Sequence, residues 1–166
     1  MTGVLQSGNV TPGHLATWTT DGIVQDGGPI LASQKVLTSI RSASFATTID
    51  QPLILPPSIV AFQLTGIIVT NASTSLLGAL GGFYTNPGQT GSVIVFAAQS
   101  YSSLTGSNLL LSVTLTAFAN TARFSSNNLP LLLNANGQYA LGFYFSLSTA
   151  LAAGTADIYA IGLDLS

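Results

Sequence analysis

The sequence predicts an all-β protein: a jelly-roll-like or Greek-key β-sandwich of about eight antiparallel strands, preceded by an extended N-terminal arm. The main observation is a series of short apolar segments, separated by turn residues, that fills the chain after residue 43. Before that point the chain is rich in Gly, Pro and Thr and holds half of the charged residues. We therefore expect an arm at 1–43 that docks onto neighbours and a β-sandwich domain at 44–166.

The first half of the expected sandwich contains three strands and one ambiguous segment. Ser44–Asp50 alternates apolar and polar residues, which predicts a strand ended by Pro52. Ile59–Thr70 predicts a long strand with a bulge or bend at Gly66. Leu76–Leu80 fits either a strand or one turn of helix. Ser92–Gln99 is apolar on both faces, which predicts a strand buried on both sides. A Greek-key sandwich of seven strands with a short helix at 76–80 is the alternative architecture.

Turn signals place the strands of the second half. Asn86-Pro87-Gly88 predicts a turn, and Asn134–Gly137 predicts a hairpin turn between strands at Leu129–Leu133 and Gln138–Ser146. Thr155–Leu165 is expected to be the closing strand.

Two of these strands show which face meets the core. In Leu109–Thr116, alternation places Leu111, Val113 and Leu115 on the core face and hydroxyl side chains on the other. In Gln138–Ser146, the residues expected to pack in the core from one face are Tyr139, Leu141, Phe143 and Phe145.

Charge is scarce in this chain. Only 5% of its residues are charged, none lies between Gln51 and Ala122, and the formal net charge is −2. So few charges give little repulsion between copies, which favours an assembly in which protein covers much of the surface. Three cations, Lys35, Arg41 and Arg123, are too few for the basic patch that nucleic acid requires.

The sequence predicts neither a membrane helix nor a secretory leader. The longest apolar stretch, Ile59–Tyr84, is interrupted by polar residues, so we expect no helical membrane span. The first residues lack the basic and apolar regions of a signal peptide, so we expect synthesis in the cytoplasm.

Residue types needed for catalysis and metal binding are few. The chain has no Cys, a single His, His14, and no Gly-x-Ser-x-Gly motif. Asp21 and Asp26 each precede a glycine and are expected to form turns. Asp157 and Asp164 are seven apart on one predicted strand, so they should point to opposite faces. We therefore expect no enzyme activity, no metal and no cofactor.

Aromatic residues are the remaining candidates for a binding site. The tyrosines that either fill the core or line a sugar-binding face are Tyr84, Tyr101, Tyr144 and Tyr159.

The segment Ser7–Gly28 reads SGNVTPGHLATWTTDGIVQDGG. It resembles an N-terminal stretch of tailed-bacteriophage virion proteins with the pattern G-N-V-T-P-G-H-x-x-x-W-x-x-x-G-x-x-Q-D-G-G, found in head-decoration, cement and fibre-like proteins. Every position of the pattern is present.

The resemblance implies a non-enzymatic virion protein, made in the host bacterial cytoplasm and added to the capsid surface. A compact β domain with a short arm looks most like a capsid decoration or cement protein that contacts the major capsid protein and associates as a homotrimer. The alternative is a tail-fibre or receptor-binding tip that recognises host surface glycan. A third interpretation is a secreted lectin-like module, which the missing signal peptide disfavours.

The arm is the predicted clamp onto neighbouring subunits, with Trp18 as its anchor. A short strap cannot bury apolar side chains within itself, so it would bury Trp18 and Ile23 against the sandwich or a neighbour. The residues expected to make these contacts are Pro12, His14, Trp18, Asp21, Ile23 and Asp26.

Overall fold

The computed structural model describes residues 5–6, 14–18, 23–29 and 34–166, and the side chains of 34–166. The chain divides into an N-terminal unit, Met1–Ser33, and a second unit, Gln34–Ser166. The predicted boundary at residue 43 is therefore too late. Residues Gln34–Ser44 form strand β4, which pairs antiparallel with the last strand of the sandwich. Because β4 is an edge strand with an exposed face, its polar sequence reads like that of an arm.

The N-terminal unit contains three strands in the order β1-β3-β2. These are β1 (Leu5–Gln6), β2 (His14–Trp18) and β3 (Ile23–Pro29). Strands β2 and β3 pair antiparallel, and β1 pairs parallel with β3.

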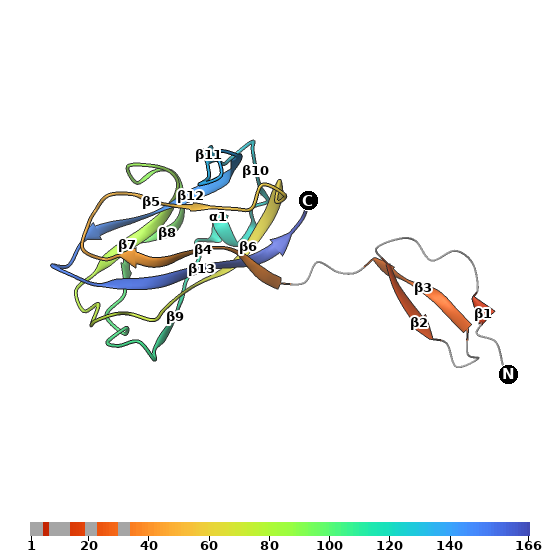
Figure 1. Cartoon of the computed structure of the whole chain (residues 1–166), viewed down its shortest axis with the longest axis horizontal. Helices are drawn as coiled ribbons and strands as arrows, with labels where there is room; N and C mark the ends of the chain where they lie inside the picture. Colours follow the sequence, from red (N-terminus) through yellow and green to blue (C-terminus); the bar gives the residue numbers. More distant parts are fainter. Residues whose placement is uncertain (1–4, 7–13, 19–22, 30–33) are drawn as a thin grey trace. The chain divides into compact units, whose positions relative to one another are not determined.

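The second unit is an all-β sandwich of two antiparallel sheets (Figure 1). One sheet has the order β10-β6-β13-β4, with β9 also paired to β6. Its strands are β4, β6 (Ala61–Thr70), β9 (Leu110–Val113), β10 (Phe124–Ser125) and β13 (Thr155–Asp164). The other sheet has the order β11-β12-β7-β8, with β5 also paired to β12. Its strands are β5 (Gln51–Ile54), β7 (Leu80–Asn86), β8 (Thr90–Ser100), β11 (Leu131–Leu133) and β12 (Tyr139–Thr149).

The main strands pair in a nested way. Strand β4 pairs with β13, β5 with β12, β6 with β9, and β7 with β8. The first main strand thus lies beside the last, the second beside the second last, and so on inward. This is the strand order of a jelly roll, so the predicted fold class is confirmed. The short strands β10 and β11 extend the sheets.

The core lies between the two sheets and is rich in phenylalanine. Phe45, Phe83 and Phe145 are fully buried, and Phe145 contacts the other two with ring centroids 5.1–5.3 Å apart. Phe62 stacks on Phe124 at 5.2 Å. Each buried phenylalanine stabilises the fold by roughly 1.5–3 kcal/mol relative to an exposed one.

Several predicted local features are confirmed. The pairing of β6 with β13 shifts register opposite Gly66, which is the expected bulge. Val113 is buried, and Leu111 and Leu115 pack against the core. In the Asn134–Gly137 turn, Gly137 has a φ of 75° and its N–H donates to the Asn134 carbonyl at 3.0 Å.

One strand prediction and one burial prediction are wrong. The predicted strand at Ser44–Asp50 is a loop after residue 44, since hydroxyl side chains take up its backbone N–H groups: Thr47 Oγ1 accepts from Ile49 N at 3.1 Å. Strand β5 instead includes Pro52, which is tolerated because β5 lies at a sheet edge. The segment predicted to be buried on both sides is β8, and it is also an edge strand, with Phe96 65% exposed.

The helix is also not where the alternative architecture placed it. Residues 76–79 form turns, and β7 begins at Leu80. The helix in the described sandwich is α1 (Ala117–Thr121), capped by Thr116, whose Oγ1 accepts from Ala119 N at 3.2 Å. Five residues are too few to produce a clear helical period in the sequence.

Candidate interaction surface

The carboxylate of Asp157 lies in a saturated polar cluster. It is 6% exposed and accepts hydrogen bonds from Ser42 N at 2.9 Å, Arg41 Nη1 at 3.0 Å and Asn71 Nδ2 at 3.2 Å. The Ser42 N–H, and then the Arg41 and Asn71 side chains, lower the pKa of Asp157 against the opposing effect of burial. Ser42 and Asn71 have φ values of 53° and 55°, so the cluster holds two non-glycine residues in the left-handed region. The cluster therefore has a structural role: it links the segments that contain Ser42, Asn71 and Asp157.

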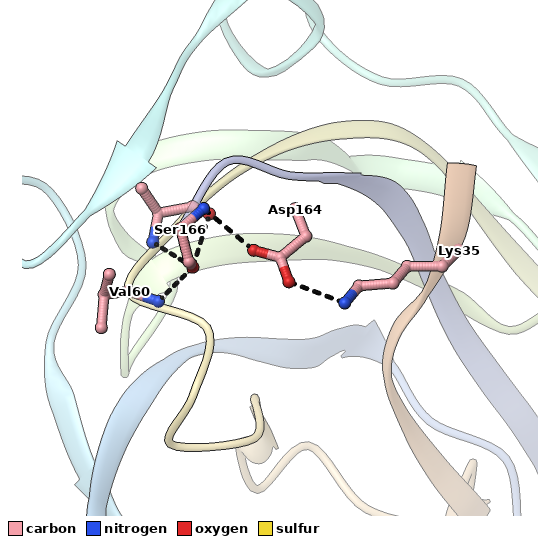
Figure 2. Close-up of polar contacts among 5 residues, drawn as sticks. Lys35, Val60, Asp164 and Ser166 are labelled. Carbon is pink, nitrogen blue, oxygen red and sulfur yellow. Dashed lines mark hydrogen bonds and ion pairs between the residues drawn. The ribbon is translucent and has the colours of Figure 1, made fainter. Parts of the chain in front are cut away.

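Asp164 takes part in a second polar cluster at the end of the chain (Figure 2). Lys35 Nζ donates to its Oδ2 at 2.7 Å, and Ser166 N donates to its Oδ1 at 3.1 Å. Hydrogen bonds from Lys35 and then Ser166 lower the pKa of Asp164 to about 2. Ser166 Oγ accepts from Val60 N at 2.8 Å, so the chain end fixes the backbone at Val60.

The four candidate tyrosines do not form a common sugar-binding face. Tyr84 and Tyr101 are 3% and 0% exposed, and burial raises the pKa of both phenols. Tyr101 packs edge-on against Phe45 at 5.1 Å. Tyr144 is half-buried, and Tyr159 lies under the Arg41 guanidinium, 4.7 Å from ring centroid to Cζ. Tyr84 and Tyr101 therefore fill the core and are not available to bind a sugar.

An apolar patch lies on the β11–β12 hairpin and the segment before β6. It consists of Val60, Leu131, Leu133 and Tyr139, which are 55–70% exposed. Leu131 and Leu133 point to the same side of β11, and Leu133 lies opposite Tyr139 in the ladder. Val60, Leu131 and Tyr139 also line one hollow of about 120 Å³. Scattered exposed apolar residues are ordinary, but a contiguous group of this kind marks an interaction surface.

The prediction that Tyr139 lies in the core with Leu141, Phe143 and Phe145 is wrong for Tyr139 alone. The other three are buried as expected, but Tyr139 is 70% exposed. It is the first residue of β12 and pairs with the end of the short edge strand β11. The sequence signal for the patch is the alternate spacing of Leu131 and Leu133 just before the Asn134–Gly137 turn. Periodicity alone assigns these two leucines to the core.

One polar hollow adjoins this patch, and a second polar hollow adjoins the first. One, of about 470 Å³, is lined by Thr85, Asn86, Gly91, Ser92, Asn127, Asn128, Leu129 and Pro130. The other, of about 490 Å³, is lined by Val60, Ala61, Arg123, Ser125, Ser126, Asn127 and Asn128. They share Asn127 and Asn128, and the hollow of about 490 Å³ shares Val60 and Ser126 with the apolar hollow.

Charge is nearly neutralised within the sandwich. Of its charged side chains, Lys35 pairs with Asp164 and Arg41 with Asp157. This leaves Asp50, whose Oδ2 accepts from Gly88 N at 2.6 Å, and Arg123, which forms no ion pair within residues 34–166. The surface of the sandwich therefore offers a partner hydroxyls, amides and apolar groups.

The predicted arm residues fall in the N-terminal unit. His14 and Trp18 begin and end β2, and Ile23 and Asp26 belong to β3, where Ala16 pairs with Asp26. Pro12 and Asp21 lie outside the described residues. The docking role assigned to all six stays a prediction.

The described parts of the chain contain neither a candidate metal centre nor a candidate membrane helix. No group of three or more His, Cys, Asp and Glu side chains converges there. No helix among these residues has the length and apolarity to cross a membrane.

The chain is a jelly-roll β-sandwich with an exposed apolar patch beside β11. No protein-family model matches the chain, and a search of curated proteins gave no match.

Proposed function

We propose that this chain is a non-enzymatic structural protein of a tailed-bacteriophage virion, a capsid decoration or cement protein. It binds the outside of the head through the major capsid protein and stabilises the seams between subunits. It is made in the host cytoplasm and joins the capsid surface as a homotrimer. The observation that carries the proposal is the apolar patch of Val60, Leu131, Leu133 and Tyr139 on a surface with almost no unpaired charge.

The physical argument starts from water exclusion. Each of these side chains gains free energy when a partner covers it, and no ring of like charges opposes the approach. Hydroxyl and amide groups around the patch can form hydrogen bonds across an interface without the cost of burying ions. Many copies on one shell would add their contacts by avidity, so each site need only be weak.

Two further features support the proposal. The jelly roll is an architecture used by viral capsid proteins and by lectins. The segment Ser7–Gly28 matches the virion-protein pattern at every defined position. In this proposal the arm is the clamp and Trp18 its anchor.

The test is co-sedimentation of the purified chain with phage heads that lack it. We expect saturable binding that is weakened by Leu131→Asn and Leu133→Asn, because a polar amide would replace a buried contact. Leu77→Asn is the matched control, since Leu77 is 69% exposed but lies outside the patch. Equal binding by the patch and control variants would refute the role of the patch.

The arm is tested in the same assay. Deleting residues 1–28 should abolish retention on heads, and Trp18→Ala should weaken it while thermal unfolding of the sandwich stays unchanged. Sedimentation velocity of the free chain measures the trimer. Absence of any binding to heads would overturn the cement role.

A further inference from the structure

We propose that the polar hollows beside β10 bind an acidic glycan, an oligosaccharide bearing carboxylate groups. The site, here called the polar trough, consists of Asn86, Ser92, Arg123, Ser126 and Asn127. This proposal goes beyond the structural role above and does not depend on it.

The trough consists of two open hollows that adjoin each other. Its two hollows, of about 470 and 490 Å³, meet at Asn127 and Asn128. One wall comes from the β7–β8 hairpin through Asn86 and Ser92, and the other from the two residues that flank β10, Arg123 and Ser126. An open polar surface that spans two adjoining hollows suits an extended ligand such as an oligosaccharide.

The central loop is held in place by its own hydrogen bonds. Asn128 Nδ2 donates to the Arg123 carbonyl at 2.9 Å, and its Oδ1 accepts from Ser125 N at 2.8 Å. Leu129 N also donates to the Ser125 carbonyl at 3.0 Å. Asn128 therefore uses its amide within the loop, and Asn127, its neighbour, is exposed in a fixed backbone frame.

The remaining side chains keep their hydrogen-bonding capacity. Within residues 34–166, the side chains of Asn86, Ser92, Ser126 and Asn127 form no hydrogen bond with another residue, and all four are exposed. Amides and hydroxyls each offer both donors and acceptors, which is the complement of a sugar hydroxyl. Four such groups lining two adjoining hollows can bind several hydroxyls of one oligosaccharide.

Arg123 adds preference for a negative charge. It is exposed, lines the trough and has no acidic partner within the described sandwich. A guanidinium binds a carboxylate through two parallel N–H···O bonds. A single cation is too little for a nucleic-acid backbone, which carries a charge at every residue. Most of the side chains that line the two hollows are amides and hydroxyls, which suit sugar hydroxyls better than the apolar side chains of a peptide or the tails of a lipid.

The experiment titrates the full ¹⁵N-labelled chain with trigalacturonate and follows amide signals by NMR. We expect shifts in the side-chain amides of Asn86 and Asn127 and in the backbone of residues 123–130. The methyl ester of the same trisaccharide, which lacks the charge, should bind about tenfold more weakly. Shifts confined to other regions, or none at millimolar ligand, would overturn the proposal.

Variants separate the two recognition elements. Arg123→Gln should reduce trigalacturonate affinity about tenfold, to the level of the ester, and leave ester binding unchanged. Asn127→Ala should weaken both ligands. Asn120→Ala is the matched control, because Asn120 is an exposed amide on α1 outside the trough, and it should weaken neither.

Inorganic phosphate tests for simple anion binding. If phosphate causes the same shifts at the same concentration as trigalacturonate, the trough is only an anion site and the glycan proposal fails. If the wild-type chain binds phage heads but not trigalacturonate, this proposal alone fails, since the apolar patch carries the structural role.

Discussion

The Asp157 cluster and the polar trough contain similar kinds of polar groups but use them in opposite ways. At Asp157, a buried carboxylate is saturated by Ser42, Arg41 and Asn71. In the trough, Asn127 and Arg123 are exposed and have no side-chain hydrogen-bond partner within residues 34–166. The first arrangement contributes to stability, because breaking it removes three hydrogen bonds to a buried carboxylate. The second contributes little to stability and is available to a ligand.

The largest expected effect is that of Asp157→Ala. The change removes the shared acceptor of three hydrogen bonds, which come from Ser42 N–H, the Arg41 guanidinium and the Asn71 amide. We expect the free energy of unfolding to fall by about 3 kcal/mol. Urea denaturation at pH 7 measures it. A loss below about 1 kcal/mol would show that water replaces the carboxylate at little cost.

Acid should destabilise the wild-type sandwich through the same carboxylates. The folded-state pKa values of Asp157 and Asp164 lie below the ordinary value of 3.8, that of Asp164 at about 2. At a pH between the folded-state pKa and the ordinary value, the unfolded chain binds more protons than the folded chain does. The free energy of unfolding therefore falls as the pH drops from about 4 to 2. Urea midpoints at pH 5 and pH 2.5 measure the fall. Asp157→Asn should reduce this loss of stability between pH 5 and pH 2.5. An equal loss in the variant would show that Asp157 does not contribute to the acid sensitivity.

A smaller loss of stability is expected when the hydrogen bonds that hold the loop of the trough are removed. Asn128→Ala removes two hydrogen bonds of the loop and should cost about 1 kcal/mol. Asn127→Ala, one residue away, should change stability by less than about 0.5 kcal/mol, because its side chain holds nothing in place. Thermal unfolding of the two variants compares them directly. Equal losses would mean that both amides are structural and that Asn127 is not free for a ligand.

The smallest expected effect concerns the Lys35–Asp164 pair. Lys35 and Asp164 are 47% and 28% exposed, so solvent screens their attraction. Lys35→Ala should cost less than about 1 kcal/mol, and the loss should shrink in 1 M NaCl. Urea denaturation at low and high salt measures both. A loss as large as that of Asp157→Ala would show that the chain end is more tightly coupled to the fold than its exposure indicates.

Sequence patterns determined much of the fold because they report local physics. Alternation in Leu109–Thr116 identified the core residues Leu111, Val113 and Leu115, and turn residues identified the β7–β8 and β11–β12 connections. The scarcity of charge excludes a basic nucleic-acid surface on composition alone. Each of these inferences needs only neighbouring residues or composition.

Tertiary structure decided whatever depends on pairing between distant segments. Strand β4 joins the sandwich only because it pairs with β13, more than a hundred residues later, so composition placed the boundary too late. Ser92–Gln99 and Tyr139 have the apolar pattern of buried residues, yet β8 lies at a sheet edge and Tyr139 opposite the short strand β11. Burial is a property of the packed sheets. A residue's own periodicity determines which face it occupies, and only the neighbouring strand determines whether that face is covered.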